Sequence, residues 1–264
     1  MTTNRRRIRF DDLQFDDLTM AEAIAEIDRL VKSRRPHRMF TINVACYIWS
    51  RKNEFLRSFY QSCELLTVDG MGLFYGARLL GLPFRETVAA SYLMFELLKI
   101  CAEKRYRIFL LGGSPEIVER VVVNLKSQNP DLLLVGHAHG YFSNDNEAEI
   151  VRQITDADAD ILFIGMASPR KEEFAYRNWE RIGVPVQIGV GGSIEILAGE
   201  RHFPPRWVRT LGLEWLGRLI QEPRRLWKRY LFTNAAFACS MARLLSEKYS
   251  LSRIILRGNK ASVK

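Results

Sequence analysis

The chain has 264 residues, of which 47% are hydrophobic and 26% are charged. This length and composition allow a sizeable buried core and exclude collagen-like and disordered proteins. The charge is uneven, because residues 200–264 hold 14 Lys/Arg and 4 Asp/Glu, a net charge of +10, whereas the whole chain carries +9. Residues 1–199 therefore carry −1. The basic C-terminal segment suggests contact with the phosphates of nucleic acid, an anionic membrane or a diphosphate ligand.

The four cysteines are scattered and have no CxxC spacing, which indicates reduced thiols rather than a disulfide framework or a zinc site. No apolar run reaches the roughly 18 residues that a transmembrane helix needs. The basic N-terminus is followed by an acidic stretch and not by the apolar core of a signal peptide. We therefore expect a cytoplasmic protein.

Residues 1–199 are predicted to alternate strands and helices. A capping box at Thr19 and Glu22 begins a helix that runs to about residue 32, and Ser91 is expected to cap a later one. The expected strands are 38–45, 65–68, 106–111, 132–136, 161–165 and 186–190, and helices are expected between them, at 70–80, 91–104, 115–128, 146–156 and 169–181 among others. This order predicts an α/β fold with a Rossmann-like, mainly parallel sheet, helices on both faces, and ligands at the carboxyl ends of the strands.

The pattern changes near residue 200. Pro204 and Pro205 interrupt the chain, and the sequence beyond them reads as helix, roughly 207–221 and then from Pro223 onward. We therefore predict an α/β domain over 1–199 and a basic helical C-terminal appendage over 200–264.

Three predicted strand–helix junctions, residues 111–115, 165–169 and 189–193, pass through a small-residue turn that ends in a serine able to cap the next helix. Glycines let the backbone approach a ligand closely, and free amides at a helix start favour anions. One such junction is more often simple punctuation, but three together favour a nucleotide crevice. None is a GxGxxG fingerprint or a P-loop, so NAD binding and ATP hydrolysis have little support. The residues assigned to this crevice are Gly112, Gly113, Gly191, Gly192 and Ser193.

Asp69 follows the predicted strand 65–68 and precedes Gly70. An aspartate at the carboxyl end of a strand points into the mouth of the sheet, where a general base or a ribose-binding carboxylate belongs. An equally good interpretation is that Asp69 caps the helix beginning at Gly70. Thr41 and Asn43 lie two apart on the preceding strand and so face the same side, where a ligand or a core hydrogen-bond network must satisfy them.

The chain has no DxD motif of the kind that metal-dependent sugar transferases use to hold a nucleotide diphosphate, and His137 and His139 have no carboxylate pair or third histidine nearby, so we expect no metal and no bound cofactor. Another cation must then neutralise a diphosphate leaving group, and the appendage supplies candidates. Arg218 and Arg225 are seven apart and would share one face of an unbroken helix, although Pro223 can kink it.

Aromatic residues alternate with these arginines, namely Trp215, Trp227 and Tyr230. This pattern is typical of a helix at a membrane interface, and a solvated basic face is the plainer alternative. Cations with aromatics also stack on nucleic acid, but no RRM, KH or helix-turn-helix signature accompanies them, so we expect no nucleic-acid partner.

Together these motifs resemble the WecG/TagA/CpsF glycosyltransferase family over residues 10–232. The block EWLGRLIQEPRRLWKRY, which begins at Glu214, is the longest and most specific match. The other matching motifs are Thr41-Ile42-Asn43, Asp69-Gly70-Met71-Gly72, Leu111-Gly112-Gly113, Gly140-Tyr141-Phe142 and Gly189-Val190-Gly191-Gly192-Ser193.

The resemblance implies metal-independent, inverting transfer from a UDP-sugar to a polyprenyl-diphosphate-linked sugar, in capsule, exopolysaccharide or O-antigen assembly. It implies that Asp69 is the general base, with Thr41 and Asn43 beside it. It also implies a homo-oligomer that is peripheral on the inner face of the cell membrane, where the appendage contacts the anionic surface and the donor diphosphate. The arginines chosen for the diphosphate are Arg218, Arg225 and Arg229.

Three motifs depart from the family pattern at the presumed crevice. Thr87 stands where the family has arginine and Tyr92 where it has aspartate, with Arg85 nearby; Lys171 replaces a glutamine and Glu195 an aspartate. We include Lys171 and Glu195 among the donor-binding residues. The donor or acceptor sugar can therefore differ from the N-acetylmannosamine chemistry best known in the family. The alternatives are an inactive copy or a non-catalytic nucleotide-sugar-binding or scaffold protein of the same pathway.

Overall fold

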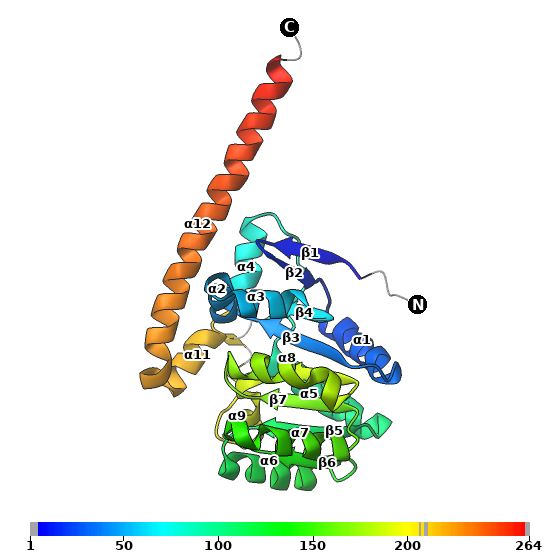
Figure 1. Cartoon of the computed structure of the whole chain (residues 1–264). Helices are drawn as coiled ribbons and strands as arrows, with labels where there is room; N and C mark the ends of the chain where they lie inside the picture. The colour runs from blue at the N-terminus through cyan, green and yellow to red at the C-terminus, as the bar shows by residue number, and fades with distance from the viewer. Residues whose placement is uncertain (1–4, 206, 209–210, 262–264) are drawn as a thin grey trace.

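A six-stranded parallel sheet forms the centre of the protein (Figure 1). The computed structural model describes the backbone of residues 5–205, 207–208 and 211–261, with side chains as far as residue 250. The strands are β3 (His37–Ile42), β4 (Leu65–Val68), β5 (Arg107–Gly112), β6 (Leu133–Ala138), β7 (Ile161–Gly165) and β8 (Val186–Gly189). Their order across the sheet is β4-β3-β8-β7-β5-β6.

Helices cover both faces of this sheet, and each face has its own apolar core. One face packs against α1 (Met20–Lys32), α5 (Ala90–Lys104), α6 (Pro115–Gln128) and α9 (Ile194–Leu197). The other packs against α2 (Val44–Lys52), α3 (Glu54–Gln61), α4 (Met71–Leu79), α7 (Glu147–Asp156) and α8 (Arg170–Ile182). Apolar strands with helices on both sides are what a parallel sheet requires. The predicted α/β fold is therefore confirmed.

The chain begins with a hairpin that the sequence did not predict, formed by β1 (Arg7–Phe10) and β2 (Leu13–Asp16). Its buried side chains include Phe10 and Phe15, but charged residues between them hide the alternation in the sequence. Asp16, the last residue of β2, is a structural charge, since the Leu66 amide of β4 donates to Asp16 Oδ2 at 3.0 Å.

Of the four serines expected to cap helices, Ser114 does so, at the start of α6. Ser168 and Ser193 instead donate their hydroxyl hydrogens to a carboxylate and to a backbone carbonyl. Ser91 lies inside α5, which begins at Ala90. Those three predictions were wrong, because α8 and α9 begin without a side-chain cap and Ser91 lies past the start of α5.

The strand predicted over 38–45 ends earlier, because Asn43 caps α2 by accepting the Cys46 amide at 3.1 Å. Thr41 is in β3 and Asn43 is not, so the argument that they share one face of a strand was wrong. A second cap, Asn53, divides the single helix expected here into α2 and α3.

The appendage consists of α11 (Glu214–Gln221) and the 39-residue α12 (Pro223–Ala261). The predicted helix 207–221 includes residues 209–210, which lie outside the described residues. The chain changes direction at Glu222, so Arg218 and Arg225 lie on different helices rather than on one face (Figure 1).

Helix α12, about 58 Å long at 1.5 Å per residue, packs against α2 and α4 before its far end projects beyond the body (Figure 1). Phe237 and Met241 of α12 contact α4 at Gly76. This contact needs a glycine, because a Cβ added at residue 76 would lie 2.6 Å from the Phe237 ring. Met241 is buried, and Lys248 donates to the Leu80 carbonyl at 2.7 Å. The appendage is thus held along the α/β part, while the domain boundary at residue 200 stays a prediction.

Gly112 ends β5 with φ +148°, and an added Cβ would lie 2.4 Å from the Gly165 carbonyl oxygen of β7. We expect Gly112→Ala to lower the free energy of unfolding by roughly 2–5 kcal/mol, because it adds overpacking to backbone strain. Gly199→Ala is the matched control, with φ +78° and no atom within 4 Å of an added Cβ, and should cost about 1–2 kcal/mol. Urea unfolding measures both variants. Equal losses would contradict the role assigned to the close approach of Gly165.

Candidate active site

A cleft of about 420 Å³ opens where the carboxyl ends of β3, β4, β5, β7 and β8 face the appendage. The sheet side contributes strand ends and the turns that follow them, and α11 and α12 form the opposite wall. Every residue that the sequence assigned to the crevice lines this cleft except Gly112. These residues are Thr41, Asn43, Asp69, Gly113, Lys171, Gly191, Gly192, Ser193, Glu195, Arg218, Arg225 and Arg229.

The sequence predicted that the Gly112 backbone contacts a ligand closely. This prediction was wrong, because Gly112 does not line the cleft. Its missing side chain makes room for the backbone of Gly165, as described above, and Gly113 is the glycine of this turn that reaches the cleft. The two glycines look alike in the sequence because only the neighbouring strand distinguishes them.

Asp69 lies at the end of β4, where its amide donates to the Ile42 carbonyl of β3 at 2.8 Å. Thr41 donates its hydroxyl to Asp69 Oδ2 at 3.4 Å, and the amide of Ala90, the first residue of α5, donates to the same carboxylate. Helix α4 has no side-chain cap, so the interpretation of Asp69 as its cap was wrong. The carboxylate instead serves the N-terminus of α5 and faces the cleft.

Burial raises the pKa of Asp69 above that of an ordinary aspartate. The charge of Arg218, the Thr41 hydroxyl and the Ala90 amide oppose this shift without cancelling it. Once deprotonated, a carboxyl with a raised pKa accepts a proton more readily than an exposed one does. Asp69 therefore has the electrostatic environment of a general base.

Lys171, where the family has glutamine, is buried and donates to the Glu172 carboxylate and the Ser168 hydroxyl. Tyr60 donates to the same Glu172 oxygen at 2.7 Å. Burial alone would lower the pKa of Lys171, but the Glu172 carboxylate beside it raises that pKa overall. Lys171 therefore brings a charged amine to the cleft wall, balanced by a buried carboxylate.

The three arginines chosen from the appendage differ in their partners. Arg225 forms an ion pair with Glu222 at the junction of α11 and α12. Within the described part of the chain, no carboxylate pairs with Arg218 or with Arg229. Cations that line a cleft without a counter-ion are suited to an anionic ligand.

The sequence missed Arg201, a further cation in the cleft. Its guanidinium pairs with Glu222 at 2.5 Å and with Glu195 at 3.6 Å, and it donates to the Gly192 carbonyl at 3.4 Å. Arg201 thereby joins the glycine turn after β8 to the appendage. Its irregular segment has no periodicity, so position just after that turn is the only signal that could have found it.

Other residues of the cleft also went unassigned. Arg170 lies over the Phe142 ring at 4.6 Å and donates to the Phe142 carbonyl. The sequence marks Tyr141 only as part of a family motif, and nothing in the sequence marks the other unassigned residues as lining the cleft. The main additions are Cys46, Trp49, Tyr141, Arg170 and Tyr230.

Arg85 does not replace the arginine that the family has at Thr87, because neither residue lines the cleft. The Arg85 guanidinium pairs with Asp17 and Glu22 near the start of α1. The cations of this cleft therefore come from other positions, chiefly the appendage.

Tyr92, where the family has aspartate, connects α5 to the appendage. Its ring stacks on Phe203 with centroids 4.7 Å apart, and its hydroxyl donates to Glu214 Oε1 at 3.2 Å. This departure from the family pattern therefore strengthens the seam between α5 and α11 and does not line the cleft.

Among the residues that the structure describes, no group of three or more His, Cys, Asp or Glu side chains is placed to hold a metal ion. Over the same residues, no helix is both long and apolar enough to cross a membrane. The expected lack of a metal or cofactor and the expected homo-oligomer stay predictions.

Asp69→Asn should stabilise the protein at neutral pH. Because the pKa of Asp69 is raised in the folded state, the folded protein binds more protons than the unfolded chain, and stability falls as the pH rises through that window. The gain should therefore be largest near pH 8 and should vanish as the pH falls below about 4, the ordinary aspartate range. Urea unfolding at both pH values measures it, with the exposed Asp145→Asn as control. A variant less stable than the wild type at pH 8 would contradict the desolvation argument.

Comparison with known proteins agrees with this cleft. The model of the Glycosyl transferase WecG/TagA/CpsF family matches residues 8–251. An N-acetylglucosaminyldiphosphoundecaprenol N-acetyl-beta-D-mannosaminyltransferase of Staphylococcus aureus (strain MW2) is 27% identical over 229 residues, 86% of this chain and 88% of that protein. An enzyme of the same name from Bacillus subtilis (strain 168) is 31% identical over 170 residues, 64% of this chain and 65% of that protein. The resemblance seen in the motifs is confirmed, and the chain belongs to the WecG/TagA/CpsF family of glycosyl transferases.

Proposed function

We propose that this protein is an inverting glycosyltransferase that needs no metal and moves a sugar from a UDP-sugar to a polyprenyl-diphosphate-linked sugar in the assembly of a bacterial surface polysaccharide. The observation that carries the proposal is the desolvated Asp69 carboxylate in a cleft whose opposite wall presents Arg218, a cation without a counter-ion in the described chain. The relatives support the acceptor class, since their name specifies transfer to N-acetylglucosaminyldiphosphoundecaprenol.

In the proposed reaction Asp69 removes the proton from the acceptor hydroxyl as its oxygen attacks the anomeric carbon of the donor. The new glycosidic C–O bond forms on the face opposite the departing UDP, so the anomeric configuration inverts. The bond between the anomeric carbon and the diphosphate oxygen breaks, and that electron pair leaves with UDP. Thr41 holds the Asp69 carboxylate through its hydroxyl, at 3.4 Å.

The donor diphosphate is proposed to lie between the Gly191–Ser193 turn and the appendage. Arg218 and Arg225 face this region of the cleft from α11 and α12, and Arg201 lies beside the turn. Guanidinium groups bind phosphate oxygens through paired N–H donors and stabilise the charge that develops on UDP. These arginines would thus take the part that a metal ion plays in DxD-type transferases.

Purified protein should release UDP from one of a panel of UDP-sugars in the presence of a short-chain prenyl-diphosphate-linked N-acetylglucosamine, with EDTA in the buffer. Asp69→Asn should lower this rate by at least about 100-fold, the usual scale of general-base catalysis, while UDP binding measured by calorimetry persists. The panel comprises UDP-glucose, UDP-glucuronate and UDP-N-acetylhexosamines.

Full activity of Asp69→Asn would contradict the base assignment. UDP binding without turnover on any donor in the panel would favour the non-catalytic alternative, a nucleotide-sugar-binding or scaffold protein. Activity that EDTA abolishes would overturn the metal-independent mechanism.

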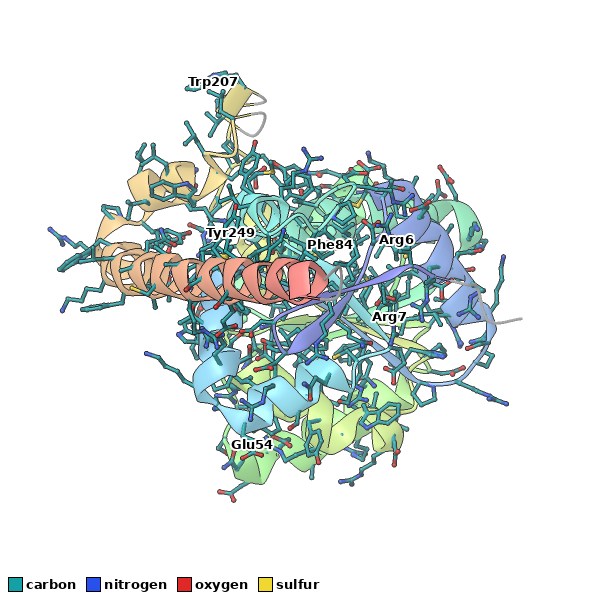
Figure 2. All side chains as sticks on the ribbon, turned by 90° about the horizontal axis from the view of Figure 1, so that it is seen from above. Arg6, Arg7, Glu54, Phe84, Trp207 and Tyr249 are labelled. Carbon is teal, nitrogen blue, oxygen red and sulfur yellow. The ribbon has the colours of Figure 1, made fainter. Side chains whose placement is uncertain are left out.

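An exposed apolar strip on the appendage supports a peripheral position on the membrane. Trp207 stands out from the body in the view from above (Figure 2), and Ile220 and Phe232 are 72% and 70% exposed. Large apolar side chains in a basic segment are typical of a surface that enters the headgroup region. The apolar strip comprises Trp207, Trp215, Ile220, Trp227, Leu231 and Phe232.

Replacing Leu231 and Phe232 together by Glu should lower binding to phosphatidylglycerol-containing vesicles by at least about tenfold, because each buried apolar side chain contributes about 1.5–3 kcal/mol. Vesicle flotation measures the bound fraction. Val123→Glu is the control, since Val123 is 65% exposed but lies on α6, away from the appendage (Figure 1). Equal flotation of the double variant and the wild type would refute docking through the apolar strip.

A further inference from the structure

The arginines that the sequence assigned together to the donor face different parts of the cleft. Arg225 pairs with Glu222, which also pairs with Arg201, whose guanidinium donates to the Gly192 carbonyl. This chain of contacts places Arg225 on the side of the cleft formed by the turn after β8. Burial lowers the pKa of Arg201, and the charges of Arg225 and Arg218 lower it further, which agrees with this placement.

Arg229 lies on another side of the cleft, close to two aromatic rings. Its guanidinium carbon is 5.7 Å from the ring centroid of Trp49, on α2, and 5.5 Å from that of Tyr230. Both rings line the cleft. Arg229 is also one of the charges that lower the pKa of Lys171, whereas Lys171 itself pairs with Glu172 on α8. Arg229 therefore belongs to the side formed by α2 and α8.

The guanidinium of Arg229 is poised for a ligand. Its Nε is buried and has no hydrogen-bond partner in the part of the chain that the structure describes, and no carboxylate there pairs with it. A buried charged donor without an acceptor is costly, and a bound anion would remove that cost. The Trp49 and Tyr230 rings attract the guanidinium through cation–π contacts without neutralising it.

The surroundings of Arg229 lead directly to the apolar strip. The Tyr230 ring contacts Trp215 edge to face at 6.0 Å, and Trp215 belongs to that strip. Phe232, also in the strip, follows Arg229 by three residues on α12, which puts the two on neighbouring parts of one helix face. A diphosphate that is attached to a membrane-anchored lipid can therefore reach Arg229 from the apolar strip.

We propose that Arg229, Trp49 and Tyr230 form the subsite for the diphosphate-linked sugar of the lipid acceptor, whereas Arg218 and Arg225 hold the donor diphosphate. The inference rests on the proposed function. It divides the cleft between two negatively charged groups, the diphosphate of the UDP-sugar donor and the diphosphate of the lipid acceptor. Asp69 lines the same cleft, and the charges of Arg218 and Lys171 both stabilise its charged form. The acceptor hydroxyl then approaches Asp69 from the side of Arg229. The anomeric carbon of the donor approaches from the side of Arg218 and Arg225.

The test compares Arg229→Gln with Arg225→Gln, using a UDP-sugar donor and a soluble short-chain prenyl-diphosphate-linked N-acetylglucosamine. Arg229→Gln should raise the KM for the acceptor about tenfold and change the KM for the donor by no more than about twofold. Arg225→Gln should show the reverse. Arg229→Lys should recover part of the acceptor affinity, because it restores the charge without the paired donors.

Lys228→Gln is the matched control, since it removes the neighbouring charge from α12 outside the cleft lining and should change neither KM. Calorimetry with farnesyl diphosphate, added to protein saturated with UDP, gives a readout that needs no turnover, and Arg229→Gln should weaken this binding about tenfold. Weaker UDP binding with unchanged farnesyl diphosphate binding in Arg229→Gln would overturn the inference. A wild type that binds farnesyl diphosphate through Arg229 but transfers sugar from no UDP donor would support the subsite and refute the proposed donor.

Discussion

A half-buried carboxylate, that of Asp69, is the constraint on which the cleft depends. Removing the Asp69 charge from water is unfavourable, and its raised pKa shows that the surroundings offset this cost only in part. The groups that do offset it come from three places: Thr41 on β3, the Ala90 amide at the start of α5, and Arg218 on the appendage. The sheet, one helix start and the docked appendage must therefore all be in place before the carboxylate is tolerated in its charged form.

The uneven charge of the chain has a structural meaning in this arrangement. The part before residue 200 carries a net −1 and supplies the acidic base, whereas the part from 200 onward carries +10 and supplies most of the cations that face it. Arg201 binds the two parts together through Glu195 and Glu222. The cleft is thus a meeting surface between two stretches of opposite charge, which attracts anionic substrates and holds its own walls together.

The α/β fold and most of the cleft could be predicted because strand–helix alternation and strand ends are properties of local sequence. What could not be predicted depends on distant partners. Ser91 lost its expected capping role because the Asp69 carboxylate, from another strand, takes the first amide of α5. Gly112 was misassigned because its neighbour across the sheet is Gly165, and Arg201 was missed because no periodicity marks its segment.

The hairpin that opens the chain touches the helix that closes it. Asp11, at the hairpin tip, accepts a hydrogen bond from Tyr47 at 2.8 Å and pairs with Arg51 of α2 and Arg243 of α12 at 3.2 Å each. The ribosome makes Asp11 long before Arg243, and domains fold from the N-terminus as they emerge. A nascent chain would present the sheet and its base before the cationic wall of Arg218, Arg225 and Arg229 had been made. The proposed sugar transfer would accordingly begin only after helix α12 had been made and had docked against the hairpin.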